Sequence, residues 1–530
     1  MNERLARLVA VVRADFLIRL RRPSTAIVFL LLSAVPYLWI PDPASGRALI
    51  VINGKRAIYN SAAIGMGTAS IGTLLIGLFG FYVISNAIRR DVLTRCGFVI
   101  ASTTMRGSEY IIGKFAGNVV FLTVFTLGFM TTSMAMVLVR GESALEPLVF
   151  ARQYLLLLPP AIMFVSALAI LFESVKWLSG KFGDVLYFFV WLAAIGGVVA
   201  TLEQNPSAQW ATWFDVSGMG VVMHQMRAYY ATNSLSIGAS NFDAAKGTMI
   251  FPGLRLGVEW ILPRLGASLW PVALLGVARL FFHRFDPARV RAAATTAKGT
   301  WLGRFNAMAK PFARLFLAPV RVVVNILPRT SLAATAAADA LTSFAAFPLA
   351  VVGVIVFAIM ALSSSSTELF TGALPIAFAG VAVTIADVAS REKRAGTTAL
   401  VFATPHLRTR FVFWKFASAL LLATLFLAIP LARAIAIRPT ASPALLVGLL
   451  FTCAAATALG VVSGNPKTFI VGFLSFWYLV TNDRGHTPTF DFAGFYGAAT
   501  PAITAAYAAA ALALLAAAHL YHARELRTRW

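Results

Sequence analysis

Few residues of this 530-residue chain have the type and spacing that catalysis needs. His486 and Asp491 form an H-x4-D string in which the histidine could act as a general base for acyl transfer, but no basic or glycine motif supports it. His519 and His522 fall at i and i+3 on a predicted helix, and no third ligand stands near them. The sequence therefore predicts no catalytic residue and no metal site.

Residues that could bind a nucleotide or carry a proton are equally few. The string closest to the phosphate-binding pattern GxxxxGK[ST] is SGNPKT at 463–468, which lacks the glycine-lysine junction that cradles phosphates. LSGK at 178–181 is only superficially similar to an ATPase signature. Glu259 is the only acid expected inside a span, with Arg264 as its expected partner on the same helix. This scarcity argues against a proton-coupled pump, because such pumps carry acids at membrane depth.

The elements that must position any site are membrane helices. Hydrophobic residues make up 59% of the chain, charged residues 12%, and the mean hydropathy is +0.78, whereas a soluble domain carries roughly 25% charged residues. Apolar runs approach the length of about 20 residues that crosses a bilayer. Of these runs, 466–478 is short enough to be re-entrant rather than spanning. The twelve runs are 24–40, 64–87, 111–139, 153–172, 185–202, 259–282, 341–362, 369–386, 411–435, 443–463, 466–478 and 501–520. The predicted fold class is an all-α polytopic membrane protein with about twelve transmembrane helices.

The net charge of +24 gives the orientation. With twelve spans and a cytosolic N-terminus, most Lys and Arg residues fall in cytosolic segments, which is the bias that orients spans during insertion. The excess is therefore interpreted as topology and attraction to anionic lipids rather than as a nucleic-acid site. Cys96 falls in a predicted cytosolic loop and Cys453 in a span, so no disulfide is expected.

A basic segment divides the chain. Residues 284–330 carry nine Lys and Arg against the single acid Asp286, and their apolar residues recur near helical spacing, as in a helix lying on the inner leaflet. The predicted organisation is a six-span unit at 1–283 with an amphipathic N-terminal segment, the cytosolic linker at 284–330 and a second six-span unit at 331–530. On the N-terminal segment, Arg19 intrudes on the apolar stripe.

The two halves also share weak sequence similarity. The loop after the second span of each half aligns without gaps at an offset of 301 residues, and both copies are expected on the cytosolic side. A duplicated unit is the economical explanation. The alignment pairs Arg90 with Arg391, Asp91 with Glu392, Thr103 with Thr404, and the run Lys114, Phe115, Ala116 with Lys415, Phe416, Ala417. Lys114 and Lys415 enter their third spans, where a lysine is expected to snorkel to the inner interface.

This pattern resembles the permease subunit of ABC type 2 transporters. The resemblance rests on the amphipathic N-terminal segment, the charged loop after the second span and a longer outer loop before the sixth span. The first copy of the loop departs from the pattern, with Thr104 in place of proline and Arg95 in place of glycine. The better copy consists of Arg391, Glu392, Lys393, Arg394, Gly396, Thr397, Thr404, Pro405, Arg408 and Lys415.

The resemblance implies a non-enzymatic transport subunit. The loops would be coupling helices that dock on cytosolic ABC ATPase subunits, expected in two copies, and the partner would bind ATP and Mg²⁺ because this chain has no cofactor site of its own. The chain would lie in a bacterial inner membrane with both termini cytosolic, and would export a lipophilic or amphiphilic substrate. The main alternative is a secondary transporter of the major facilitator class, whose signature between the second and third spans has a glycine that is missing before Asp91. The predicted ATPase-coupling residues are Arg90, Asp91 and Arg95 in the first half, and Arg391, Glu392 and Arg394 in the second.

Overall fold

The computed structural model describes residues 3–21, 23–175, 178–230, 234–283, 285, 331–346 and 350–529, with a few single positions between 308 and 328. The chain divides into two compact units, Met1–Ala293 and Ala294–Trp530. The basic linker predicted at 284–330 lies almost entirely outside the described residues.

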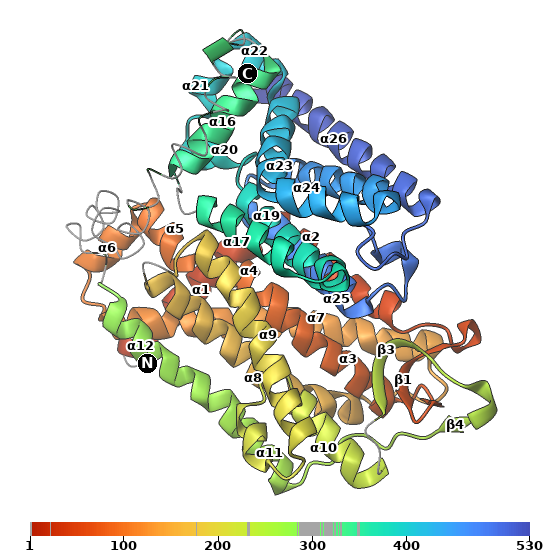
Figure 1. The fold of residues 1–530 in the computed structure, drawn as a ribbon. Helices are drawn as coiled ribbons and strands as arrows, with labels where there is room; N and C mark the ends of the chain where they lie inside the picture. The colour runs from red at the N-terminus through yellow and green to blue at the C-terminus, as the bar shows by residue number, and fades with distance from the viewer. Residues whose placement is uncertain are drawn as a thin grey trace. The chain divides into compact units, whose positions relative to one another are not determined.

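The first unit is mainly helical (Figure 1). Its helices are α1 (Glu3–Leu20), α2 (Pro23–Trp39), α3 (Ser61–Leu75), α4 (Phe81–Ile84), α5 (Ala87–Leu93), α6 (Cys96–Ser102), α7 (Gly107–Arg140), α8 (Pro147–Ser174), α9 (Lys181–Gln204), α10 (Met219–Tyr230), α11 (Val258–Leu269) and α12 (Ala273–Phe281). A π-helical turn, η2 (Ile76–Gly80), joins α3 to α4, and a 3-10 helix, η3 (Gln209–Phe214), follows α9.

The second unit contains helices and short helical turns. They are α16 (Leu332–Ala346), α17 (Ala350–Ser363), α18 (Ser366–Glu368), the π-turn η6 (Leu369–Ala373), α19 (Leu374–Ile385), α20 (Arg391–Ala395), α21 (Thr398–Phe402), α22 (Pro405–Thr409), α23 (Phe411–Ile437), α24 (Ser442–Ser463), α25 (Pro466–Asp483) and α26 (Pro501–Arg529). Three short helices, α20 to α22, therefore separate α19 from α23.

Among the described residues, nine helices are long and apolar enough to cross a membrane. They coincide with nine of the twelve predicted runs, and the helical membrane architecture is therefore confirmed. The other three runs are shorter or less apolar helices. The run at 24–40 forms α2 with 17 residues, and the run at 341–362 divides between the end of α16 and the 14-residue α17. The run at 466–478 lies within α25, which has 18 residues and includes Lys467 and Asp483.

The first unit also contains a small sheet that the sequence analysis did not anticipate. Its strands, β1 (Arg47–Ile52), β2 (Lys55–Ala57), β3 (Leu235–Asn241) and β4 (Thr248–Met249), lie in the order β3-β1-β2-β4. Asn53 and Gly54 turn the β1–β2 hairpin with φ values of 52° and 80°, the left-handed pair that a two-residue hairpin turn favours. Glu142 secures the hairpin because its carboxylate accepts hydrogen bonds of 2.7 Å from both terminal nitrogens of Arg56.

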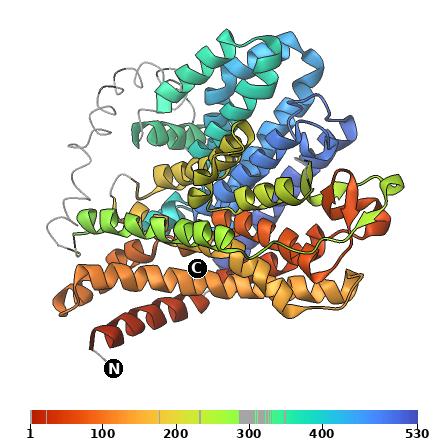
Figure 2. The same ribbon diagram turned by 90° about the horizontal axis from the view of Figure 1, so that it is seen from below.

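Glycines let α1 approach α7 closely in the first unit. A Cβ atom added to Gly113 would lie 2.9 Å from Val11 Cγ1, and one added to Gly117 would lie 3.6 Å from a carboxylate oxygen of Asp15. These two glycines lie one turn apart on α7, the small-xxx-small spacing that lets membrane helices pack backbone to backbone. Figure 2 shows the dark red α1 running along the orange α7. The close contact places the polar residues of α1 against the start of α7.

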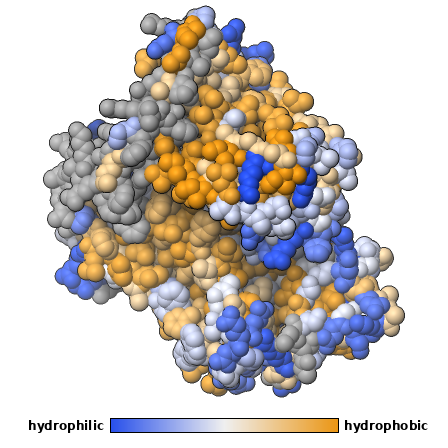
Figure 3. All heavy atoms as spheres, viewed as in Figure 1, coloured by the Kyte–Doolittle hydropathy of each residue, from blue (hydrophilic) through white to orange (hydrophobic). Residues whose placement is uncertain are grey.

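The surface of the spanning helices is apolar. Leu148 and Leu155 on α8 are 82% and 74% exposed, and Leu512 on α26 is 69% exposed. On the face drawn in Figure 3, hydrophobic surface covers wide areas of helix, and hydrophilic residues gather near the small sheet. Apolar side chains on this scale are unfavourable in water and are typical of contact with lipid.

Candidate functional site

The loop between α4 and α7 folds into two short helices. Asn86, just before α5, and Arg95, just before α6, adopt left-handed backbone with φ values of 76° and 61°. The first amides of α5 find their acceptor on another helix, because the carboxylate of Glu173 near the end of α8 accepts from the backbone nitrogens of Ala87 and Ile88 at 3.1 and 2.6 Å. Such capping by a carboxylate satisfies helix amides that have no partner inside the helix. The loop is thus held rigidly to the spanning helices.

A buried charged cluster lies behind this loop. Asp15 of α1, 1% exposed, is its centre. One of its carboxylate oxygens lies 2.6 Å from an Arg90 nitrogen and 3.0 Å from Lys114 Nζ, and the other lies 2.6 Å from an Arg19 nitrogen. Asp91 completes the cluster at 2.8 Å from Lys114 Nζ. The cluster therefore joins α1, the loop and α7.

Three cations surround two carboxylates in this first cluster. Burial by itself raises the pKa of Asp15, but Arg19, Lys114 and Arg90 outweigh it and hold the pKa below its usual 3.8. Arg19 also donates a 2.6 Å hydrogen bond to Asn118 of α7. Arg19 therefore interrupts the apolar stripe of α1 because it faces a buried carboxylate and amide, not lipid.

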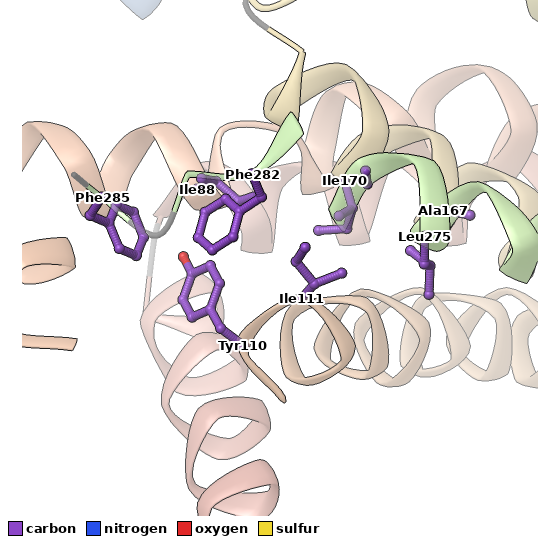
Figure 4. Close-up of a cluster of buried hydrophobic side chains, with 9 residues drawn as sticks. Ile88, Tyr110, Ile111, Ala167, Ile170, Leu275, Phe282 and Phe285 are labelled. Atoms are coloured by element: carbon purple, nitrogen blue, oxygen red, sulfur yellow. The ribbon is translucent and has the colours of Figure 1, made fainter. Parts of the chain in front are cut away.

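The first cluster rests on a hydrophobic layer (Figure 4). The Tyr110 hydroxyl donates to Asp91 at 2.7 Å, and the Tyr110 ring stacks on Phe282 with centroids 5.3 Å apart. Ile88 of α5 and Ile111 of α7 belong to the same layer. One tyrosine thus joins the charged cluster to the apolar packing beneath it.

The second unit contains a matching buried cluster behind its own loop. Asp339 of α16 lies 3.2 Å from an Arg391 nitrogen and 3.0 Å from Lys415 Nζ of α23. Lys415, which is fully buried, also lies 2.5 Å from a carboxylate oxygen of Glu392. Arg391 lies 3.6 Å from Asp387 as well. A helix, a loop and the lysine of the following long helix are again joined, here with two cations and three carboxylates.

The two clusters correspond at the offset of 301 residues. Arg90, Asp91 and Lys114 match Arg391, Glu392 and Lys415. In each unit an aspartate on a helix earlier in the chain, α1 or α16, contacts both the arginine and the lysine. The hydrophobic layers correspond too, because Ile88, Tyr110 and Ile111 match Ala389, Phe411 and Val412, and all six lie in the buried layers of their units. Phe411 has no hydroxyl, so Glu392 lacks the donor that Tyr110 supplies to Asp91.

The backbone matches at one position where the two loop sequences differ. Arg95 and Gly396 fall at the same offset, and both are left-handed, with φ values of 61° and 70°. A glycine adopts this conformation without steric strain, whereas a residue with a Cβ atom does so at a cost of roughly 1–2 kcal/mol. Arg95 in place of glycine is therefore a change of side chain on a retained backbone.

The six predicted coupling residues fall into two groups. Arg90, Asp91, Arg391 and Glu392 point into the clusters, where each makes at least one ion pair. Arg95 and Arg394 are exposed on the loops. The lysines Lys114 and Lys415 do not snorkel as predicted, because buried carboxylates bind their ammonium groups.

Each loop also exposes an apolar side chain at a matched position. Val99 on α6 is 67% exposed, and Leu400 on α21, 301 residues later, is 75% exposed. Phe98, beside Val99, is 36% exposed. Apolar side chains on polar loops mark a surface that another molecule can cover.

The other sequence candidates have structural roles. The Asp491 carboxylate accepts hydrogen bonds from the backbone nitrogens of Tyr496 and Ala498 and so shapes its loop. Arg264 is paired with Asp215 rather than with Glu259 as predicted, at 3.7 Å, and it donates to the carbonyls of Leu156 and Leu157.

Asp15, Asp339, Tyr110 and Glu173 were missed by the sequence analysis. The one available signal was the pair Asp15 and Arg19, four residues apart within the apolar stripe of α1.

No family model, curated protein or solved structure matches this chain.

Proposed function

We propose that this chain is the permease subunit of an ATP-driven exporter of the kind that ABC type 2 transporters represent, with two six-span units fused in one polypeptide. The observation that carries the proposal is the repeated site: in each unit a buried aspartate–arginine–lysine cluster lies behind a loop that exposes an apolar residue at the matched position, Val99 or Leu400. A site built twice, with an aspartate, an arginine and a lysine joined in the same way, fits two equivalent partner subunits.

The mechanism follows from the division of each loop into a buried and an exposed side. The exposed side, with Val99 and Arg95 or Leu400 and Arg394, would contact an ATPase subunit. The buried side is joined by ion pairs to α1 and α7 in the first unit, and to α16 and α23 in the second. A displacement of the loop would therefore move α7 or α23 with it, because separating buried charges is energetically costly.

The proposal includes twelve spans and both termini in the cytosol. α2, α17 and α25 would then cross the membrane, and the 17 residues of α2 give a length of about 26 Å at 1.5 Å per residue, slightly less than a hydrocarbon core of about 30 Å. The chain would lie in a bacterial inner membrane, oriented by the cytosolic Lys and Arg. Its substrate would be lipophilic or amphiphilic, and ATP and Mg²⁺ would bind to the partner.

Co-purification with the ATPase tests the proposal. Val99→Glu and Leu400→Glu together are expected to abolish co-purification and ATP-driven transport, because each places a charge where an apolar contact is proposed. Thr528→Glu, which adds the same charge at an exposed position of α26, is the control and is expected to leave both unchanged. Transport by reconstituted vesicles from a proton gradient alone, with no ATPase present, would establish the secondary-transporter alternative.

A further inference from the structure

A cavity of about 840 Å³ lies in the second unit. Its walls come from α18 and η6, from the end of α23, and from the end of α25 with the loop that follows. Its lining includes Arg438, Arg484, Phe370, Phe495, Thr481 and Tyr496. The proposed topology places all these segments at the side of the membrane opposite the two loops.

Two arginines line this cavity without a carboxylate partner in the described part of the chain. Arg438 ends α23, and its guanidinium carbon lies 4.0 Å from the centroid of the Phe370 ring. Arg484 follows the last residue of α25 as its C-cap, in left-handed backbone with φ 49°, which is unfavourable for a residue with a Cβ atom. Both guanidinium groups thus retain their hydrogen-bonding capacity for a ligand.

The acids on the neighbouring segments are bound to backbone amides. Glu368 accepts from the nitrogen of Ser365 at 2.8 Å, and Asp483 accepts from the nitrogen of Thr487 at 2.7 Å. Asp491 accepts from two amides of its own loop. None of these three carboxylates forms a described ion pair with Arg438 or Arg484, so both guanidinium groups can approach an anion without breaking one.

The remaining lining defines the ligand's chemistry. The Tyr496 hydroxyl offers a further hydrogen bond, whereas Thr481 Oγ1 donates to the carbonyl of Trp477 at 3.0 Å. The rings of Phe370 and Phe495 offer apolar contact. Guanidinium groups bind phosphate oxygens in a bidentate manner, with two parallel hydrogen bonds each. An anionic group beside an apolar part would thus satisfy both kinds of wall.

We propose that this cavity binds a phosphate group carried on an amphiphilic molecule, with Arg438 and Arg484 as the anion ligands. Only the location on the outer side rests on the proposed function. The binding itself needs no ATPase and is measured without one, so its failure is distinguishable from failure of the transport proposal.

The experiment uses the purified full chain in a neutral detergent. Titration with dioleoyl phosphatidic acid is expected to raise the apparent Tm, and dioleoyl phosphatidylcholine is expected not to. Arg438→Gln with Arg484→Gln should weaken the apparent affinity by roughly tenfold or more per guanidinium removed. Arg47→Gln, at an exposed arginine of β1, is the matched control and is expected to bind as the wild type does.

Inorganic phosphate is the second probe. Stabilisation by phosphatidic acid at concentrations where inorganic phosphate has no effect supports an amphiphilic ligand. Equal stabilisation by both supports the anion site but overturns the apolar part of the proposal. The double variant should also elute as a monodisperse protein. If it does so and still binds phosphatidic acid as the wild type does, the proposed site is wrong.

Discussion

Two single variants, Lys114→Met and Lys415→Met, should lower the free energy of unfolding by unequal amounts. In the first unit, Lys114→Met leaves Asp15 paired with Arg19 and Arg90, and it leaves Asp91 beside Arg90 and the Tyr110 hydroxyl. The loss is then that of hydrogen bonds to a charged group, about 1.5–3 kcal/mol.

Lys415→Met is more damaging because Lys415 is the only described ion-pair partner of Glu392. Asp339 keeps Arg391, but the Glu392 carboxylate stays buried with no cation. Removing one partner of a buried pair costs about 3–5 kcal/mol. The expected difference between the two variants is therefore about 2 kcal/mol, which corresponds to roughly 4–8 °C in Tm for a unit of this size.

The two cysteines make the assay specific to the second unit. Cys453 is fully buried on α24, whereas Cys96 is exposed, so in a Cys96→Ser background a thiol-reactive dye reports the opening of the second unit alone. Lys415→Met should lower the temperature at which Cys453 reacts, and adding Glu392→Gln should restore most of the loss. The Tm of the whole chain, followed by tryptophan fluorescence, should fall more in Lys415→Met than in Lys114→Met. Equal decreases in Tm, or no increase in the Cys453 reaction temperature when Glu392→Gln is added to Lys415→Met, would refute the reasoning.

Other predictions test the loop backbone, the sheet and the topology. Gly396→Ala should destabilise the second unit by about 1–2 kcal/mol in a thermal melt, since an added Cβ meets nothing within 4 Å and only the left-handed backbone opposes it, whereas Arg95→Gly should not destabilise the first unit. Hydrogen bonds from Arg56 outweigh burial and hold the pKa of Glu142 below its usual 4.5. The stability that the ionised Glu142 adds is therefore complete above pH 4.5 and is lost as the pH falls through the lowered pKa. Thermal melts at a series of pH values should show this loss in the wild type and not in Glu142→Gln. A membrane-impermeant maleimide should label Cys96 in inside-out vesicles only; labelling of right-side-out vesicles instead would invert the proposed topology.

The membrane helices could be predicted because their signal is local. An apolar run of sufficient length leaves no alternative to a helix in lipid, which is why nine runs coincide with long apolar helices. The β1–β2 hairpin also had a local signal, the Asn53-Gly54 pair after the apolar run 48–52, but it lay in a segment between two predicted spans that was interpreted only as a loop. β3, by contrast, pairs with β1 from far along the chain, as Arg47 with Asn241, and no local pattern announces such a pairing.

The candidate site was predictable only on its loop side. Charge and spacing identified Arg90, Asp91, Arg391 and Glu392, but the aspartates that bind the two arginines lie on helices far away in the sequence. Asp15, for instance, meets Lys114 from 99 residues away. Charged residues near a span look like solvated anchors in a sequence, and only the packing of α1 on α7 and of α16 on α23 shows that they are buried partners.

The described ion pairs of each cluster close within a single unit. The first cluster uses residues between Asp15 and Lys114, and the second uses residues between Asp339 and Lys415. A polypeptide cut between 294 and 330 would therefore separate no described ion pair of either cluster. If the two halves were made as separate chains, each would keep all the described ion pairs of its own cluster. Each half could then be mutated or labelled without changing the other.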